Sequence, residues 1–176
     1  MEKQESRLGF RLMILAFKIR DFFSPRITVL REPEIKPGQI VLDYGCGPGN
    51  YILPLSSLVG PSGEILALDI NPLAIKCVED VVLKKALKNV KTIQSGCDTG
   101  LPDQSIDIVL LYDAYHDLTN PDEVLKEIHR ILKEGGLLSF SDHHQREEEI
   151  KEKITDNNLF RFSKKGKKTY TFLRDG

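Results

Sequence analysis

The fold is decided by the stretch Val41-Leu42-Asp43-Tyr44-Gly45-Cys46-Gly47-Pro48-Gly49-Asn50. It begins as a short apolar run, typical of a buried strand, and continues into three glycines at alternate positions. Glycine allows backbone conformations that other residues avoid, and it lets a ligand come close to the main chain. A helix that starts just beyond such a loop directs its free amides at the ligand. The stretch therefore predicts a strand, a ligand-binding turn and a helix.

Further short apolar runs follow along the chain, each bounded by Gly, Asp or Asn. Together with the first run they predict strands at Ile40–Tyr44, Glu64–Asp69, Val90–Gln94, Ile106–Leu111 and Leu137–Ser141. Helical stretches alternate with these runs, which predicts an α/β fold with a mostly parallel sheet and right-handed crossovers. In such sheets the ligand lies beyond the carboxyl ends of the strands, so the loops after each strand should carry the function.

Two of the predicted helices have clear start signals, an asparagine followed by a proline. The first starts at Asn71-Pro72 and runs to Leu83; its expected apolar face consists of Leu73, Cys77, Val78, Val81 and Val82. The second starts at Asn120-Pro121 and is expected to stop at Gly135–Gly136; its apolar face consists of Val124, Leu125, Ile128, Ile131 and Leu132.

The two ends of the chain predict additions to this core. An apolar-faced helix over Leu8–Phe23 and a proline-containing linker form an N-terminal extension, residues 1–34, with the main domain at 35–176. Charged residues interrupt this helix, which argues against a membrane span or an export signal, and we expect it to act as a lid over the binding pocket. The C-terminal part predicts a charged helix at Arg146–Asp156 and an antiparallel hairpin of Asn158–Phe162 and Thr169–Leu173.

Composition and charge are those of an ordinary globular protein. The 176 residues suit one domain, and the three cysteines, Cys46, Cys77 and Cys97, have neither zinc-finger spacing nor the even number of a disulfide framework. We therefore expect no metal site and a cytoplasmic location. Both ends are basic: residues 1–31 hold seven Lys/Arg against three Asp/Glu, and residues 157–176 hold six against one.

The stretch 41–50 resembles the first motif of class I S-adenosylmethionine-dependent methyltransferases of the small-molecule and quinone-biosynthesis type. The resemblance extends from about Ile35 to Ser141. It implies a Rossmann-like fold, S-adenosylmethionine as cofactor and methyl transfer to a small molecule. It also implies that Asp43 faces the methionine amino group, and that the loop touches the cofactor through Gly45, Cys46, Gly47 and Gly49.

The same resemblance assigns residues after the next two strands. Asp69 lies about twenty residues beyond the glycine loop, where an acid accepts hydrogen bonds from ribose hydroxyls in dinucleotide folds. In the family the equivalent acid holds the cofactor ribose, and Ile70 is expected to pack on the adenine. Cys97 and Asp98 resemble the adenine-side motif after the third strand. Asp107, before the main part of the fourth strand, is expected to be structural.

The loop after the fourth strand resembles the segment that touches the methionine part of the cofactor and faces the acceptor. Tyr112 is assigned to the cofactor, and Tyr115 and His116 are candidate catalytic residues. A histidine can act as a general base near neutral pH, although it can equally form a hydrogen bond within its loop. Asp142, His143 and His144 follow the fifth strand and lie on the same rim, where a metal site or a base is the alternative interpretation. We expect neither, because adjacent histidines normally cannot both point at one site.

Alternative functions remain open at this stage. A nucleotide-dependent oxidoreductase would also have glycines after the first strand, but its usual GxGxxG spacing is absent, and Asp43 stands two residues before the first glycine. A cofactor-binding module without turnover, which recruits nucleic acid through the basic ends, is the other alternative. If the first strand of the hairpin runs parallel to the core strands, Lys164, Lys165, Lys167 and Lys168 would lie at the active-site rim and attract an anionic acceptor.

Overall fold

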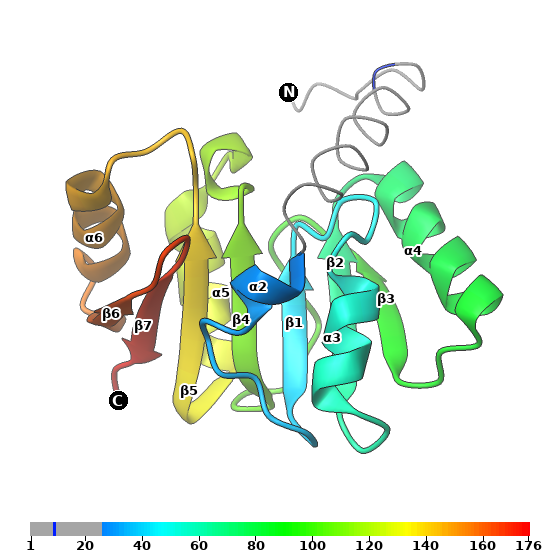
Figure 1. Ribbon diagram of the computed structural model, residues 1–176. Helices are drawn as coiled ribbons and strands as arrows, with labels where there is room; N and C mark the ends of the chain where they lie inside the picture. Colours follow the sequence, from blue (N-terminus) through cyan, green and yellow to red (C-terminus); the bar gives the residue numbers. More distant parts are fainter. Residues whose placement is uncertain (1–8, 10–25) are drawn as a thin grey trace.

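The computed structural model describes Gly9 and residues 26–176, and its central element is one seven-stranded sheet (Figure 1). In spatial order the strands are β3 (Val90–Gln94), β2 (Glu64–Asp69), β1 (Ile40–Tyr44), β4 (Ile106–Tyr112), β5 (Leu132–Ser141), β7 (Tyr170–Arg174) and β6 (Phe160–Lys165). The strands β1 to β5 are parallel, and β7 is antiparallel to both of its neighbours. The predicted α/β fold with a C-terminal antiparallel hairpin is confirmed.

Helices cover both faces of the sheet (Figure 1). One face packs against α2 (Arg26–Leu30), α3 (Ile52–Val59) and α4 (Pro72–Lys85); the other packs against α5 (Pro121–Ile131) and α6 (Glu147–Thr155). Side chains of β1 alternate between the two faces of the sheet. Val41 lies in the core on the side of α2, α3 and α4, and Leu42 lies in the core on the side of α5 and α6. A 3-10 turn, η1 (Tyr115–Asp117), follows β4 at the carboxyl edge of the sheet.

The strand predictions are accurate for β1, β2 and β3, whereas the boundary between α5 and β5 was wrong. The helix was predicted to continue to Gly135–Gly136. It ends at Ile131, and β5 begins at Leu132. Leu132 is extended, with φ −69° and ψ 135°, is fully buried and pairs with Ile106. A register shift between Ile106 and Ile108 accommodates the extra residues. Burial of Leu132 therefore ends the helix before the glycines do.

The two helix starts differ in detail. Asn71 caps α4 as predicted, because its Oδ1 accepts a hydrogen bond of 2.9 Å from the amide of Leu73. Asn120 precedes α5 but makes no side-chain cap. The apolar face of α5 is buried as predicted. On α4 the prediction is confirmed for Val78, which is buried, and for Val81 and Val82, which pack against the same core. Ala74 and Ile75, which were not predicted, are also buried.

The predicted helix Leu8–Phe23, and with it the lid, lies outside the described residues apart from Gly9. The short helix α2 was not predicted. Its Val29 and Leu30 are buried in the core cluster that includes α3, so part of the segment assigned to the extension packs into the domain. None of the helices in the part of the chain that the structure describes is long and apolar enough to cross a membrane.

Because β7 is antiparallel to both β5 and β6, β6 runs in the same direction as β5. Lys165 pairs with Tyr170, and Tyr170 pairs with Phe140 near the end of β5. The hairpin turn therefore lies level with the carboxyl ends of the core strands. The first hairpin strand extends further than predicted, to Lys165, and includes a register shift between Phe162 and Lys164.

Candidate functional site

Two glycines of the loop after β1 have different surroundings: Gly45 is closely packed, and Gly47 has open space beside it. Gly45 has φ +78°, and an added Cβ would lie 2.7 Å from the Cβ of Ala114. Gly47 has φ +51°, but an added Cβ there would meet nothing within 4 Å. Gly45 is thus required for close packing between loops, whereas Gly47 faces space that a ligand can occupy. The side chain of Cys46 is buried in the core, so its contact with a ligand would come from the backbone.

Asp69 connects the loop after β2 to the glycine loop. Its Oδ2 accepts a hydrogen bond of 2.9 Å from the amide of Gly47, and its Oδ1 accepts one of 2.8 Å from the amide of Asn71. Burial raises the pKa of Asp69 above its ordinary value, against the lowering effect of these amides. Each carboxylate oxygen has two acceptor positions, so Asp69 can still receive hydroxyl groups of a ligand.

Asp43 is buried at the end of β1, with 2% of its surface exposed. Among the described residues, its Oδ2 has no hydrogen-bond partner. Burial, and then the nearby charge of Asp69, raise the pKa of Asp43 to about 7. An unpaired buried carboxylate is costly, and a cationic group of a ligand would relieve that cost. Asp43 therefore fits the ammonium group that the cofactor carries.

Ile70 and Gly96 form an apolar surface beside Asp69. Ile70 is 46% exposed, and its Cδ1 lies 3.1 Å from the position that a Cβ on Gly96 would take. The hydroxyl of Tyr44 donates a hydrogen bond to the carbonyl of Gly96 and fixes this loop. An exposed isoleucine beside a fixed backbone offers a surface on which a planar ring can pack, which fits the predicted role of Ile70.

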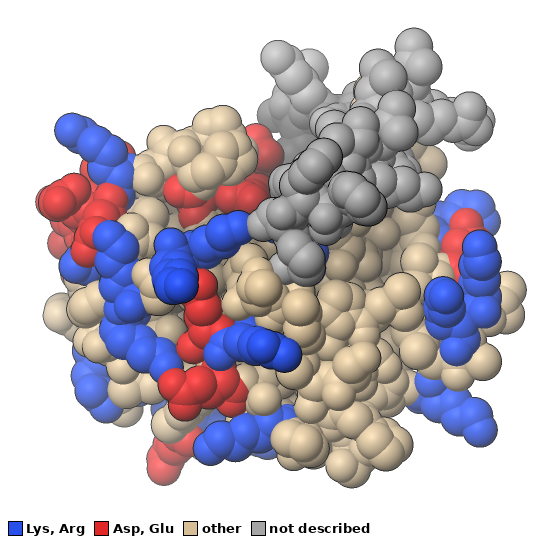
Figure 2. Space-filling view, in the orientation of Figure 1, with Lys and Arg blue, Asp and Glu red and all other residues tan. Residues whose placement is uncertain are grey.

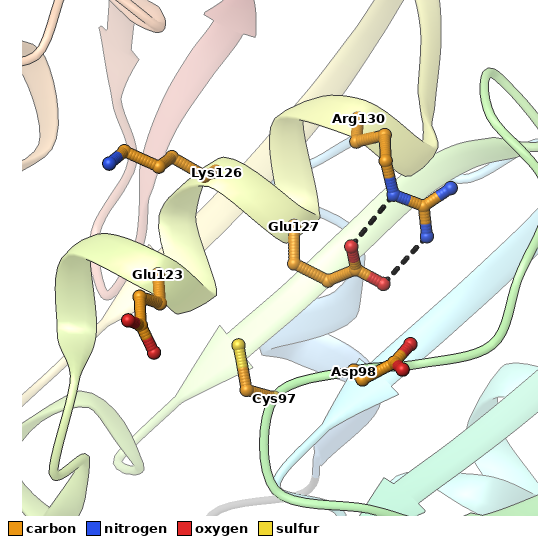
Figure 3. A pocket seen from close by; sticks show the side chains of 6 residues that line it. All are labelled: Cys97, Asp98, Glu123, Lys126, Glu127 and Arg130. Carbon is orange, nitrogen blue, oxygen red and sulfur yellow. Dashed lines mark hydrogen bonds and ion pairs between the residues drawn. The ribbon is translucent and has the colours of Figure 1, made fainter.

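Cys97 and Asp98 lie in the next part of this loop, at the edge of a cavity of about 470 Å³ against α5 (Figure 3). The thiol of Cys97 points toward α5, and Asp98 is exposed, with its Oδ1 accepting a hydrogen bond from the amide of Gly100. Opposite them, Arg130 holds the pKa of Glu127 at about 2. Burial raises the pKa of the Cys97 thiol, which disfavours a nucleophilic role.

The two tyrosines assigned after β4 have their rings in the core. The Tyr112 hydroxyl lies 2.7 Å from Ser139 Oγ, and its ring packs edge-on against Tyr51. The ring of Tyr115 is buried and packs edge-on against Phe140. The structure therefore does not bring these two side chains to the rim with His116, and their assigned roles stay predictions.

His116 is held by the buried carboxylate of Asp142, a pairing that the sequence did not reveal. Its Nδ1 lies 2.9 Å from Asp142 Oδ2, which also accepts a hydrogen bond from the His116 amide. Burial alone would raise the pKa of Asp142, but hydrogen bonds from the His144 amide and the His116 ring lower it below its ordinary value. With Nδ1–H donating to Asp142, Nε2 of His116 carries the lone pair of a general base. Asp142 thus orients the His116 ring, and Nε2 is the atom that can take a proton.

The expectation that His143 and His144 point in opposite directions was wrong. Their rings lie side by side, with centroids 4.0 Å apart, and the His144 ring is 4.2 Å from that of His116. Alternation holds within a strand, but β5 has ended at Ser141, and the chain turns where the His144 amide donates to Asp142 Oδ1. His143 Nδ1 lies 2.9 Å from Asp113 Oδ1.

Two further side chains have structural roles. Asp107 accepts hydrogen bonds of 2.8 Å from the amide of Ile40 and from Lys133 Nζ, as expected for a residue that joins strands. His129, on α5, is half-buried. Its Nε2 lies 2.7 Å from the carbonyl of Asp175, and its ring packs against Phe160. The C-terminal segment therefore packs against α5 and partly covers this histidine.

The sheet order, the glycine loop after β1 and the acid after β2 define an α/β domain of the class I methyltransferase type, with the cofactor site at the carboxyl edge of the sheet. The sequence model of the methyltransferase domain family matches residues 35–176. The chain therefore belongs to this family, whose cofactor is S-adenosylmethionine.

Named relatives agree with this family. The chain is 34% identical over 113 residues to a demethylmenaquinone methyltransferase of Geobacillus kaustophilus, covering 64% of this chain and 48% of that protein. It is 30% identical over 145 residues to a ubiquinone/menaquinone biosynthesis C-methyltransferase of Shewanella baltica, covering 81% and 57%. The chain spans about half the length of these curated relatives. A solved S-adenosylmethionine-dependent methyltransferase from Aquifex aeolicus superposes with a TM-score of 0.75 at 26% identity, covering 89% of this chain and 96% of that one.

Proposed function

We propose that this chain transfers a methyl group from S-adenosylmethionine to a small-molecule acceptor that loses a proton to His116 Nε2. The observation that carries this proposal is the hydrogen bond between His116 and buried Asp142, at the edge of the sheet where the cofactor loops end. The same arrangement of a histidine and an orienting carboxylate serves many enzymes as a general base.

The cofactor would be held by residues of three neighbouring loops. Asp43 would pair with the ammonium of its methionine part, Asp69 would accept the ribose hydroxyls, and Ile70 would pack on the adenine. Gly47 leaves the space in which the ligand lies against the backbone. When bound, S-adenosylmethionine supplies an electrophilic methyl group attached to a sulfonium centre.

The remaining chemistry belongs to the chain. Asp142 fixes the His116 ring and keeps the hydrogen on Nδ1, so that Nε2 is free to take a proton from the acceptor. Asp117 Oδ2 lies 3.4 Å from Nε2 and would stabilise the imidazolium that forms. Much of the remaining acceleration would come from holding the acceptor in line with the methyl group.

The acceptor we propose is a small aromatic molecule of the quinol type, because the curated relatives are named for demethylmenaquinone and ubiquinone/menaquinone methylation. An anionic substituent would be favoured by the basic hairpin. There, a cavity of about 570 Å³ is lined by Thr28, Arg31, Glu32, Lys164, Lys165, Gly166, Lys167 and Lys168. Figure 2 shows Lys and Arg side chains gathered over this side of the molecule.

Two of these lysines already have acidic partners. Lys164 pairs with Glu34, and Lys165 pairs with Glu147. Arg31 and Lys167 line the same cavity and would contribute to the pull on an anion. A cytoplasmic location is part of the proposal and is supported by the three cysteines, which are all free thiols.

Calorimetry with S-adenosylmethionine, its demethylated product and NAD tests cofactor choice; we expect the first two to bind and NAD not to bind. Transfer of a labelled methyl group is then measured with a panel of demethylated quinols and with a metabolite extract. Binding of NAD alone would refute the cofactor assignment. Binding of S-adenosylmethionine without transfer to any pool would instead favour the binding module without turnover.

A further inference from the structure

Two aspartate–histidine pairs cross between the loops that follow β4 and β5. Asp113, after β4, pairs with His143, after β5, at 2.9 Å between Oδ1 and Nδ1. Asp142, after β5, pairs with His116, after β4, at the same distance between Oδ2 and Nδ1. In each pair, the carboxylate of one loop therefore contacts the imidazole of the other loop. The ring of His144 lies beside the rings of His116 and His143.

This cluster lacks a fixed positive charge. Within the part of the chain that the structure describes, the ion pairs of Asp113, Asp117 and Asp142 are all with histidines. Other acidic residues of the protein form ion pairs with Lys or Arg; Glu127, for example, pairs with Arg130. Histidine, unlike lysine and arginine, carries no permanent positive charge, so these neighbouring carboxylates form an environment that attracts a cation.

The positions of the donor atoms fit a metal ion. One ligand atom from each of Asp113, Asp142 and His143 lies within 4.8 Å of the others. We propose that these three residues bind one divalent first-row transition metal ion, with Zn²⁺ as the representative. Imidazole with carboxylates suits such ions, whereas Mg²⁺ and Ca²⁺ prefer ligand sets made of oxygen alone.

Access and coordination agree with this assignment. The side chain of Asp142 is fully buried and that of His143 is 67% exposed, so an ion would enter from solvent past the imidazole and rest on the carboxylate. Binding replaces the hydrogen between His143 Nδ1 and Asp113: the neutral ring moves its proton to Nε2, and the Nδ1 lone pair goes to the ion. Three protein ligands leave at least one coordination position for water.

The site does not depend on methyl transfer, so it can be tested without an acceptor. Full-length protein without an affinity tag is stripped with a chelator and titrated calorimetrically with Zn²⁺; Co²⁺ then reports coordination through its visible absorption. We expect one ion per chain. Asp113→Asn and His143→Gln should each weaken binding by at least about tenfold, as losses around metal sites commonly do.

His129→Gln is the matched control, because His129 is the one histidine of this sequence outside the cluster and contacts Asp175. It should bind Zn²⁺ like the wild type. Thermal unfolding of each variant in chelator checks the fold, and His143 is exposed enough for its replacement to be tolerated. Absence of binding, or equal affinity in all four proteins, would overturn the proposal and leave the crossed pairs as braces between two loops.

Discussion

The amide of Gly47 donates a hydrogen bond of 2.9 Å to Oδ2 of Asp69, so the glycine loop after β1 is fixed by the acid that ends β2. The two residues are predicted to touch different parts of the cofactor. Their mutual contact sets the loop before a ligand arrives, which reduces the entropy that binding must overcome.

Replacing Asp69 by Asn should affect binding more than folding. The amide keeps one acceptor for Gly47 or Asn71 but loses the charge, so unfolding should cost about 1 kcal/mol less, and S-adenosylmethionine affinity should fall by a few kcal/mol at most. Calorimetry and urea unfolding measure the two effects. Asp80→Asn, at an exposed position of α4, is the control. A variant that unfolds and is not rescued by cofactor would make Asp69 a purely structural residue.

Replacing Gly47 by Ala separates ligand access from packing. Gly47 and Gly135 both have positive φ and no atom near an added Cβ, but only Gly47 lies at the cofactor loop. Each substitution should lower the free energy of unfolding by about 1–2 kcal/mol through backbone strain. Only Gly47→Ala should also weaken S-adenosylmethionine binding. Equal affinities in the two variants would show that the space at Gly47 is not used by the cofactor.

The buried Asp43 predicts an unusual dependence of stability on pH. Its pKa is raised from 3.8 to about 7, so the folded protein binds a proton that the unfolded chain releases. The free energy of unfolding without cofactor should therefore fall as pH rises from about 4 to about 7, and stay level above that.

Asp43→Asn removes this effect. The variant should be more stable than the wild type at pH 8, by on the order of a few kcal/mol, and similar at pH 4, while binding S-adenosylmethionine more weakly. Urea unfolding at both pH values gives the comparison. Lower stability of the variant at pH 8 would mean that the carboxylate has a stabilising partner in the free protein.

His116→Gln tests the proposed base. The rate of methyl transfer should fall by about 10²–10⁴-fold with little change in S-adenosylmethionine affinity, because His116 is proposed to contact the acceptor and not the cofactor. His129→Gln, as the remote histidine, should retain activity. If both histidine variants keep wild-type rates, proton removal occurs elsewhere.

The basic hairpin predicts a salt effect with an anionic acceptor. Lys167→Gln with Lys168→Gln should lower kcat/KM at low salt, and the difference should vanish near 1 M salt, where the Debye length is about 3 Å. Lys84→Gln with Lys85→Gln removes the same charge from the far end of α4, which points to the opposite edge of the sheet. Identical salt dependence in both double variants would assign the hairpin a structural role alone.

Local sequence signals were sufficient for much of the fold. Strands β1, β2 and β3 have the predicted bounds because an apolar run flanked by turn residues is a local pattern. The start of β5 was missed because it depends on the pairing of Leu132 with Ile106 across the sheet. The short helix α2 is held by tertiary burial of Val29 and Leu30, which no local pattern reports.

For the candidate site, too, local motifs were found from the sequence, whereas contacts between distant residues were not. The glycine loop, Asp69 and Ile70 were identifiable from a family-like motif, and the structure places them together. Asp142 was considered only as a neighbour of two histidines, since its contact with His116 joins residues 26 positions apart. Residues that function through a partner on another strand can be found in sequence as types, but their pairing requires the sheet order.

The outermost strands of the described sheet both expose basic side chains: Arg161, Lys164 and Lys165 on β6, and Lys91 on β3. An edge strand presents unpaired backbone groups that could extend the sheet into a neighbouring molecule. Alignment of two β6 strands would bring the exposed basic side chains of one copy close to those of the other. The composition of β6 therefore disfavours extension of the sheet at this edge by a second copy of the chain.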